Sequence, residues 1–207
     1  MLRQIQIIAI LAFATSCGST AKKIEKFERA CKSTPIQAAD LNQFNTPASP
    51  GKIQVVRLFR SSSPYCREDL KKISSLFSSG EWKASEIQLI LIAFKKPGIE
   101  SRKTFDHFVR NELADYSLPL ETTQIVYLDR AFPSLKEAKS KSGEEIFADW
   151  KGIPYGLVFA KNGRLAYRGH FTASPIVQEN QYKFITSLQN EDCGTPPGPL
   201  TLAPKPQ

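Results

Sequence analysis

The cysteines are the residues of this sequence best suited to covalent chemistry. The 207-residue chain holds four of them, Cys17, Cys31, Cys66 and Cys193, but only two histidines. A cysteine thiolate is a nucleophile and forms disulfides, whereas two histidines without clustered cysteines are too few for an ordinary zinc site. The sequence therefore predicts thiol chemistry, and it predicts neither a metal site nor another cofactor.

The first residues of the chain predict export. Arg3 supplies a short positive region, and a mostly apolar stretch from Ile5 to Ala14 is followed by small residues. Ala14-Thr15-Ser16-Cys17 resembles the lipobox, the signal at which bacterial lipoproteins are cut before a cysteine that then carries the lipid. We therefore expect a signal peptide over residues 1–16 and a lipid on Cys17. Ala12-Phe13-Ala14 also fits an ordinary cleavage site, which would release the protein without a lipid.

Both routes place the protein in the bacterial cell envelope. About 20 apolar residues are needed to cross a bilayer, and no segment is that long, so we expect attachment to a membrane through the lipid, facing the periplasm. The formal net charge is +8, but lysines and arginines are scattered, with no basic stripe of interleaved aromatic residues. We therefore expect no nucleic-acid partner.

The envelope is oxidising, and so it permits disulfides. If Cys17 carries a lipid, three cysteines are left, and any single pairing among them leaves one thiol unpaired. Cys31 and Cys193 flank the region of regular pattern, and closing so long a loop stabilises a fold by several kcal/mol in the chain-entropy model. We therefore expect a disulfide between Cys31 and Cys193, with Cys66 as the free thiol.

The elements that position Cys66 follow from the spacing of apolar residues. Short apolar runs predict strands, and apolar residues three and four apart predict helices. Lys161-Asn162-Gly163 predicts a hairpin turn between the last two strands. The predicted strands cover residues 53–59, 87–94, 124–128, 156–160 and 164–168, and the predicted helices lie around residues 70–77, 105–116, 132–138 and 177–188. This order predicts an α/β fold with a sheet that is parallel where helices cross over and antiparallel at its end.

The ends of the chain differ from this region in composition. We expect residues 17–50 to be an N-terminal helix and a proline-containing linker, and residues 51–190 to be the folded domain. Residues 191–207 are rich in proline, which predicts a disordered tail.

Two motifs lie at informative places in this order. Ser63-Pro64-Tyr65-Cys66 stands where the first strand gives way to the first helix, and Gly152-Ile153-Pro154 precedes the hairpin. The first resembles the Cys-x-x-Cys site of the thioredoxin superfamily, and the second is similar to its cis-proline loop. The chain looks most like TlpA-like envelope thioredoxins. This resemblance implies a three-layer thioredoxin-like fold, with a central mixed sheet that ends in an antiparallel hairpin and helices on both faces.

The first motif departs from the family at one position. Ser63 stands where family members have the nucleophilic cysteine, and a serine hydroxyl is too weak an acid to replace that thiol without a dedicated base. By resemblance, Ser63 and Cys66 mark the catalytic position. Pro64, Tyr65, Ile153 and a cis Pro154 would form the groove that binds an extended peptide.

Three functions are compatible with this site. Cys66 could serve thiol-disulfide exchange or oxidant sensing with protein thiols as partners, the groove could bind peptides without redox chemistry, or the Ser-x-x-Cys could act as a peroxiredoxin-like peroxidase. The pKa of Cys66 bears on this choice. A helix N-terminus, Arg60 and Arg67 favour the thiolate, whereas burial and the carboxylates of Glu68 and Asp69 oppose it. The sequence leaves this balance open.

Overall fold

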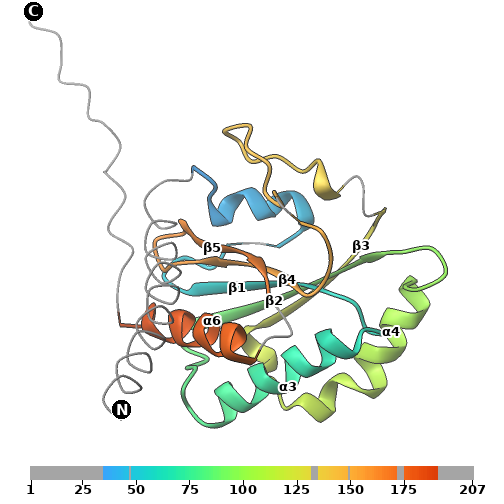
Figure 1. Ribbon diagram of the computed structural model, residues 1–207, viewed down its shortest axis with the longest axis horizontal. Helices are drawn as coiled ribbons and strands as arrows, with labels where there is room; N and C mark the ends of the chain where they lie inside the picture. The colour runs from blue at the N-terminus through green and yellow to red at the C-terminus, as the bar shows by residue number, and fades with distance from the viewer. Residues whose placement is uncertain (1–34, 47, 132–134, 149, 172–174, 191–207) are drawn as a thin grey trace, which may run out of the picture.

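The computed structural model describes residues 35–46, 48–131, 135–148, 150–171 and 175–190 (Figure 1). Its elements in chain order are η1 (Ala38–Phe44), β1 (Ile53–Phe59), α3 (Pro64–Ser78), β2 (Ile87–Lys95), α4 (Arg102–Asn111), η2 (Leu113–Tyr116), η3 (Leu120–Thr122), β3 (Thr123–Ala131), β4 (Tyr155–Phe159), β5 (Leu165–His170) and α6 (Pro175–Ser187). None of the described helices combines the length and apolar character that crossing a bilayer requires.

β1 is the middle strand of a five-stranded sheet with the order β3-β2-β1-β4-β5. All seven of its residues are buried, because helices and loops cover both faces of the sheet. β1 pairs in parallel with β2 and antiparallel with β4, and β4 and β5 form the hairpin predicted around Asn162-Gly163. The predicted mixed sheet and the order of its strands are therefore confirmed, whereas the helix predicted around residues 132–138 lies partly outside the described residues.

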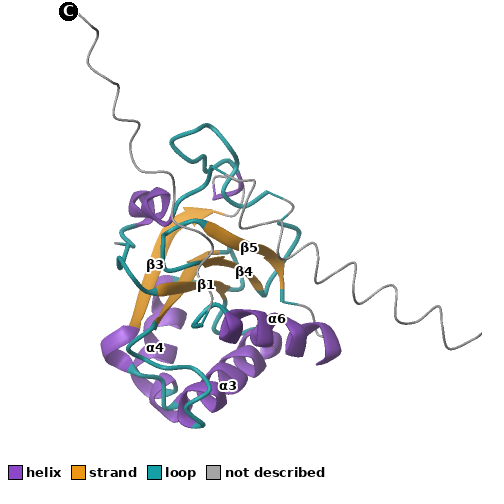
Figure 2. Cartoon of the chain, turned by 90° about the vertical axis from the view of Figure 1, so that its left-hand side faces the viewer, coloured by secondary structure: helices purple, strands orange, loops and turns teal. Residues whose placement is uncertain are grey.

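Two separate clusters of buried side chains lie on the two faces of the sheet. Successive residues of a strand point to opposite faces, so Val55 belongs to one cluster and Val56 to the other. On the first face pack α3, α4 and α6, which lie together on one side of the sheet in Figure 2. The second face is covered by the 3-10 helix η1 and by residues between β3 and β4, including Phe147 and Trp150. The layers are thus helices, sheet, and a mixed layer of 3-10 helix and loop.

The segment before β1 differs from its prediction as a linker. Within it, η1 places Leu41 and Phe44 in the core, and Ile36 is buried as well. Ile36 accepts a hydrogen bond from the backbone of Leu165 in β5. Residues 36–44 are therefore part of the packed structure, although prolines and a glycine at 35, 47, 50 and 51 gave the segment the composition of a loop.

The helix predicted around residues 105–116 is also interrupted. α4 ends at Asn111, Glu112 leaves helical geometry at its C-cap, and η2 continues the chain as a short 3-10 helix. Phe105, Phe108 and Tyr116 still contribute to one buried cluster. The predicted apolar face is therefore present although the helix is not continuous.

Candidate functional site

The register of the sheet brings the two motifs to one edge. Leu58 of β1 pairs with Tyr155 of β4, so Pro154 lies beside the carboxyl end of β1, where the loop to α3 begins. The Ile153–Pro154 peptide bond is cis, as the resemblance implied. The segments that carry Ser63 and Pro154 are thus brought together by strand pairing, although they are far apart in the sequence.

Ser63 serves as the N-cap of α3. Its hydroxyl accepts a hydrogen bond from the backbone N–H of Cys66, at 3.4 Å, and Pro64 occupies the first turn, where a missing N–H costs nothing. Ser63 is only 1% exposed. Its hydroxyl therefore holds the start of the helix and is not presented to solvent.

Cys66 lies in the core. Its side chain belongs to the buried cluster under α3, it is 2% exposed, and it is the free cysteine among the described residues. Burial raises the pKa of the Cys66 thiol, although hydrogen bonds from the Ser63 side chain and the Arg60 backbone act in the opposite direction. The charge of Asp69 raises this pKa further. The sequence left two opposing effects on this thiol undecided, and in the structure burial prevails.

A buried charge network lies beside Cys66. Asp69 accepts a hydrogen bond from Arg57 Nε at 3.1 Å and another from the hydroxyl of Tyr182. The Arg57 guanidinium also stacks over the ring of Phe171, 3.4 Å from its centroid. Burial first, and then the negative charge of Asp69, raise the pKa of Tyr182, so its hydroxyl remains a hydrogen-bond donor. The network joins β1, α3 and α6 beneath the site.

This network is not predicted from the sequence as a structural unit, although two signals point to it. Arg57 interrupts an otherwise mostly apolar strand, and Asp69 falls on the same side of α3 as the buried Cys66 and Ile73. A charged residue in the buried stripe of an element needs a partner. The identity of that partner was not visible, because Arg57 and Asp69 come from different elements.

A second buried polar contact fixes the loop between β1 and α3. Ser61 donates a hydrogen bond to Glu100 Oε1, at 2.8 Å, and both residues are 2% exposed. The loop carbonyl of Ser61 also accepts a hydrogen bond from Arg67 Nε, at 2.7 Å. The loop that leads to Ser63 is therefore tied to the turn after β2 and to the first turn of α3.

The part of the site that faces solvent is apolar. Pro64 is exposed, Tyr65 is 59% exposed, and Ile153 is partly buried. Within the described ranges, no hydrogen bond uses the backbone N–H or C=O of Ile153. An exposed aromatic ring and a stretch of backbone outside the strand pairing, just before β4, are features that can bind an extended peptide.

The remaining predicted site residues are three cysteines. Cys17, Cys31 and Cys193 lie outside the described residues, so the lipid and the disulfide stay predictions. Within the part of the chain that the structure describes, no histidine, cysteine and carboxylate side chains gather in a group that could hold a metal ion.

Comparisons with known proteins agree with the topology. No protein-family model matches the chain, and no curated protein sequence matches it. A solved structure of an uncharacterized thioredoxin-like protein from Porphyromonas gingivalis superposes with a TM-score of 0.50 at 14% identity, over 70% of this chain and 81% of that one. The fold is thioredoxin-like.

Two further solved structures superpose on the chain with lower TM-scores. A thiol-disulfide isomerase from Corynebacterium glutamicum gives a TM-score of 0.47 at 14% identity, over 78% of this chain and 90% of that one. A thioredoxin-like protein from Aeropyrum pernix gives 0.45 at 20% identity, over 84% and 98%. At these identities, function has to be argued from the residues of the site.

Proposed function

We propose that this chain is a bacterial envelope protein whose thioredoxin-like domain binds extended peptide segments without exchanging disulfides. The observation that carries the proposal is that Ser63 and Cys66 are both buried. The Ser63 hydroxyl caps α3, and the Cys66 side chain is 2% exposed, with a thiol whose pKa is raised. Disulfide exchange needs an accessible thiolate, and neither residue supplies one.

The exposed edge supports the binding part of the proposal. Tyr65 presents an aromatic ring beside a motif whose polar groups are buried, and the backbone of Ile153 has no hydrogen bond among the described residues. An extended peptide would pair with the Ile153 backbone and pack apolar side chains on Tyr65 and Pro64. Such binding needs no thiol.

Binding of fluorescent, cysteine-free peptides of extended sequence, followed by anisotropy, tests this proposal. Tyr65→Ala should weaken the peptides that bind by roughly tenfold, which corresponds to about 1.4 kcal/mol. Leu120→Ala is a matched control, because Leu120 is also exposed, at 69%, but stands before β3 at the opposite end of the sheet. The proposal is wrong if no peptide binds, or if both variants weaken binding equally.

A second candidate function, redox sensing through Cys66, is favoured by one observation. Hydrogen bonds from Ser63 and from the Arg60 backbone stabilise the thiolate that burial disfavours. Alkylation of the native protein over a range of pH distinguishes the candidates. Modification of Cys66 below about pH 9 would support sensing, whereas modification only after unfolding supports the binding role. A peroxidase needs an accessible thiolate as well, so the same burial disfavours it.

We also propose that Cys17 carries the lipid and that Cys31 and Cys193 form a disulfide. The support is the lipobox-like sequence Ala14-Thr15-Ser16-Cys17 and the position of the other two cysteines on either side of the domain. Mass spectrometry of the protein from the membrane fraction tests both. An N-terminal peptide that begins at Cys17 without added lipid mass, or directly after Ala14, would contradict the anchor. Free thiols at Cys31 and Cys193 would contradict the disulfide.

A further inference from the structure

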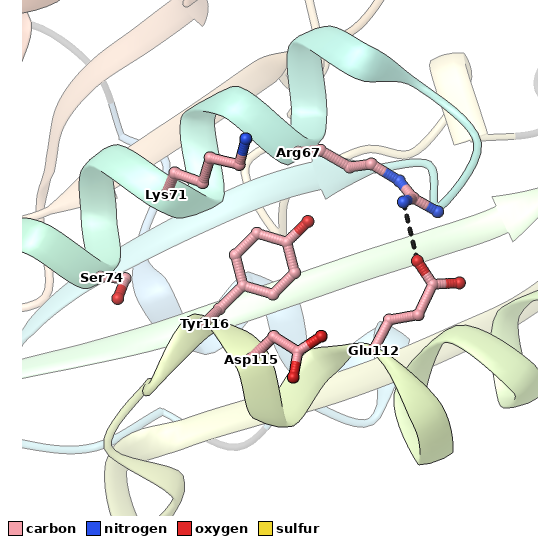
Figure 3. Close-up of a pocket in the computed structure, with 6 residues that line it drawn as sticks. All are labelled: Arg67, Lys71, Ser74, Glu112, Asp115 and Tyr116. Atoms are coloured by element: carbon pink, nitrogen blue, oxygen red, sulfur yellow. Dashed lines mark ion pairs between the residues drawn. The ribbon is translucent and has the colours of Figure 1, made fainter.

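A pocket of about 300 Å³ lies between α3 and η2, and neither Tyr65 nor Pro154 lines it. Residues at positions i, i+4 and i+7 on one face of α3 form one wall, and residues at the end of α4 and in η2 form the other (Figure 3). The lining residues are Arg67, Lys71, Ser74, Glu112, Asp115 and Tyr116.

The two walls carry opposite charges. α3 contributes the cations Arg67 and Lys71, and the facing wall contributes the carboxylates of Glu112 and Asp115. Arg67 Nη1 and Glu112 form an ion pair across the pocket at 2.7 Å, and Figure 3 shows these two side chains pointing toward each other. This pair leaves Lys71 and Asp115 as the charges available to a ligand.

The side chains of Lys71 and Asp115 make few hydrogen bonds or ion pairs with other residues. Lys71 reaches Glu68 only at 3.7 Å, and both side chains are largely exposed. For Asp115, no side-chain hydrogen bond or ion pair occurs within the described parts of the chain. Tyr116 stands between the walls, with its hydroxyl directed toward α3 in Figure 3. Burial raises the pKa of Tyr116, so at neutral pH this hydroxyl is a donor.

We propose that this pocket binds a small zwitterion of amino-acid or dipeptide size, with its carboxylate on Lys71 and Tyr116 and its ammonium on Asp115. A simple anion would meet the carboxylates of Glu112 and Asp115, and a simple cation would meet Arg67 and Lys71. A molecule with both charges can place its negative group beside the cations of α3 and its positive group beside the carboxylates of the facing wall. The volume accommodates one or two amino-acid residues, so a longer chain would extend into solvent.

Titration of the ¹⁵N-labelled protein with the dipeptide alanylalanine tests the proposal by NMR. We expect saturable shifts of the backbone amides of Lys71, Ser74 and Tyr116. N-acetyl-alanylalanine, which lacks the ammonium, and alanylalanine amide, which lacks the carboxylate, should each bind about fivefold more weakly or worse, as expected for the loss of one exposed charge pair.

Three substitutions test whether the pocket residues bind the dipeptide. Lys71→Gln and Asp115→Asn should each weaken the zwitterion by a similar factor. Lys72→Gln is the matched control, because Lys72 pairs with Glu179 of α6 at 3.4 Å and does not line the pocket. The proposal fails if alanylalanine gives no saturable shifts, if the blocked dipeptides bind equally well, or if the shifts centre on Tyr65 and Ile153. Only the last result would bear on the peptide-binding proposal.

Discussion

Arg57 and Asp69 form an ion pair inside the core, with Arg57 Nε and Asp69 Oδ2 3.1 Å apart and both side chains at most 3% exposed. Asp69 lies one helical turn after Cys66, so the pair lies directly beside the motif. Removing two charges from water costs free energy, and the attraction between the two side chains offsets that cost only while both partners are present. The pair therefore constrains how α3 packs against β1 more tightly than contacts between apolar side chains alone would.

Replacing one partner of this pair should be strongly destabilising. Asp69→Asn leaves the Arg57 guanidinium buried without a counter-charge, and we expect a loss of about 3 kcal/mol in the free energy of unfolding, measured by urea denaturation. Glu68→Gln, on the adjacent exposed position of α3, should change it by less than about 0.5 kcal/mol. A similar effect of both variants would mean that solvent screens the buried pair.

The burial of Cys66 predicts a pH dependence of stability. In the unfolded chain a thiol ionises near about pH 8.5, whereas burial raises the pKa in the folded state. Above this pH the unfolded chain binds fewer protons than the folded one, so the free energy of unfolding falls as pH rises, by up to about 1.4 kcal/mol per pH unit. Below about pH 8 both states keep the proton, and the thiol causes no loss.

The measurement compares the wild type with Cys66→Ala from neutral to alkaline pH, up to about pH 10. The stability advantage of the wild type should shrink over this range. Burial also raises the pKa of Tyr167 to about 12, and that of Tyr182 is raised as well, but both tyrosines are present in the two proteins and their effects cancel in the difference. A constant difference would show that the thiol ionises as easily in the folded state as in the unfolded one.

Restoring a second thiol tests whether the missing cysteine or the burial of Cys66 is what would prevent disulfide exchange. The Ser63 hydroxyl lies within hydrogen-bonding distance of Cys66, so under mild oxidation Ser63→Cys should form a disulfide between the introduced thiol and Cys66, detected as the loss of two hydrogens by mass spectrometry. The lost cap should cost about 1 kcal/mol. Because both positions are buried, reduction of a polypeptide disulfide should stay slow. Rapid turnover would show that only the missing thiol, and not burial, prevents exchange.

Gly156 is a close backbone contact of the buried pair. A Cβ at this position would lie 2.7 Å from Arg57 Nη1 and from the carbonyl oxygen of Val56, and 2.6 Å from the Phe171 ring. The carbonyl belongs to a central strand and cannot move aside, so Gly156→Ala should destabilise the fold by about 1–3 kcal/mol in thermal or urea unfolding. Gly152→Ala meets nothing within 4 Å and should change stability by less than about 0.5 kcal/mol.

The strands were predictable because they are short, mostly apolar runs bounded by turn residues. The limits of β1 match the prediction, and β2 differs by one residue, Lys95. The packing of Leu41 and Phe44 was not predicted, because the prolines around them outweighed a short apolar pattern. The motif at Ser63 to Cys66 was located correctly at the start of α3. The outcome for the Cys66 thiol was not predictable, because its pKa depends on atoms that only the folded chain brings together.

The chain enters the domain at the far end of the sheet from the site. Gln37 bridges to Arg164, and Ala38 donates a hydrogen bond to Gly163, at the hairpin turn, whereas Pro154 precedes the other end of β4. The first described residues therefore lie at the end of the sheet opposite Pro154. In a lipid-anchored protein this orientation would point the Tyr65 edge outward from the bilayer, within reach of polypeptides passing through the periplasm.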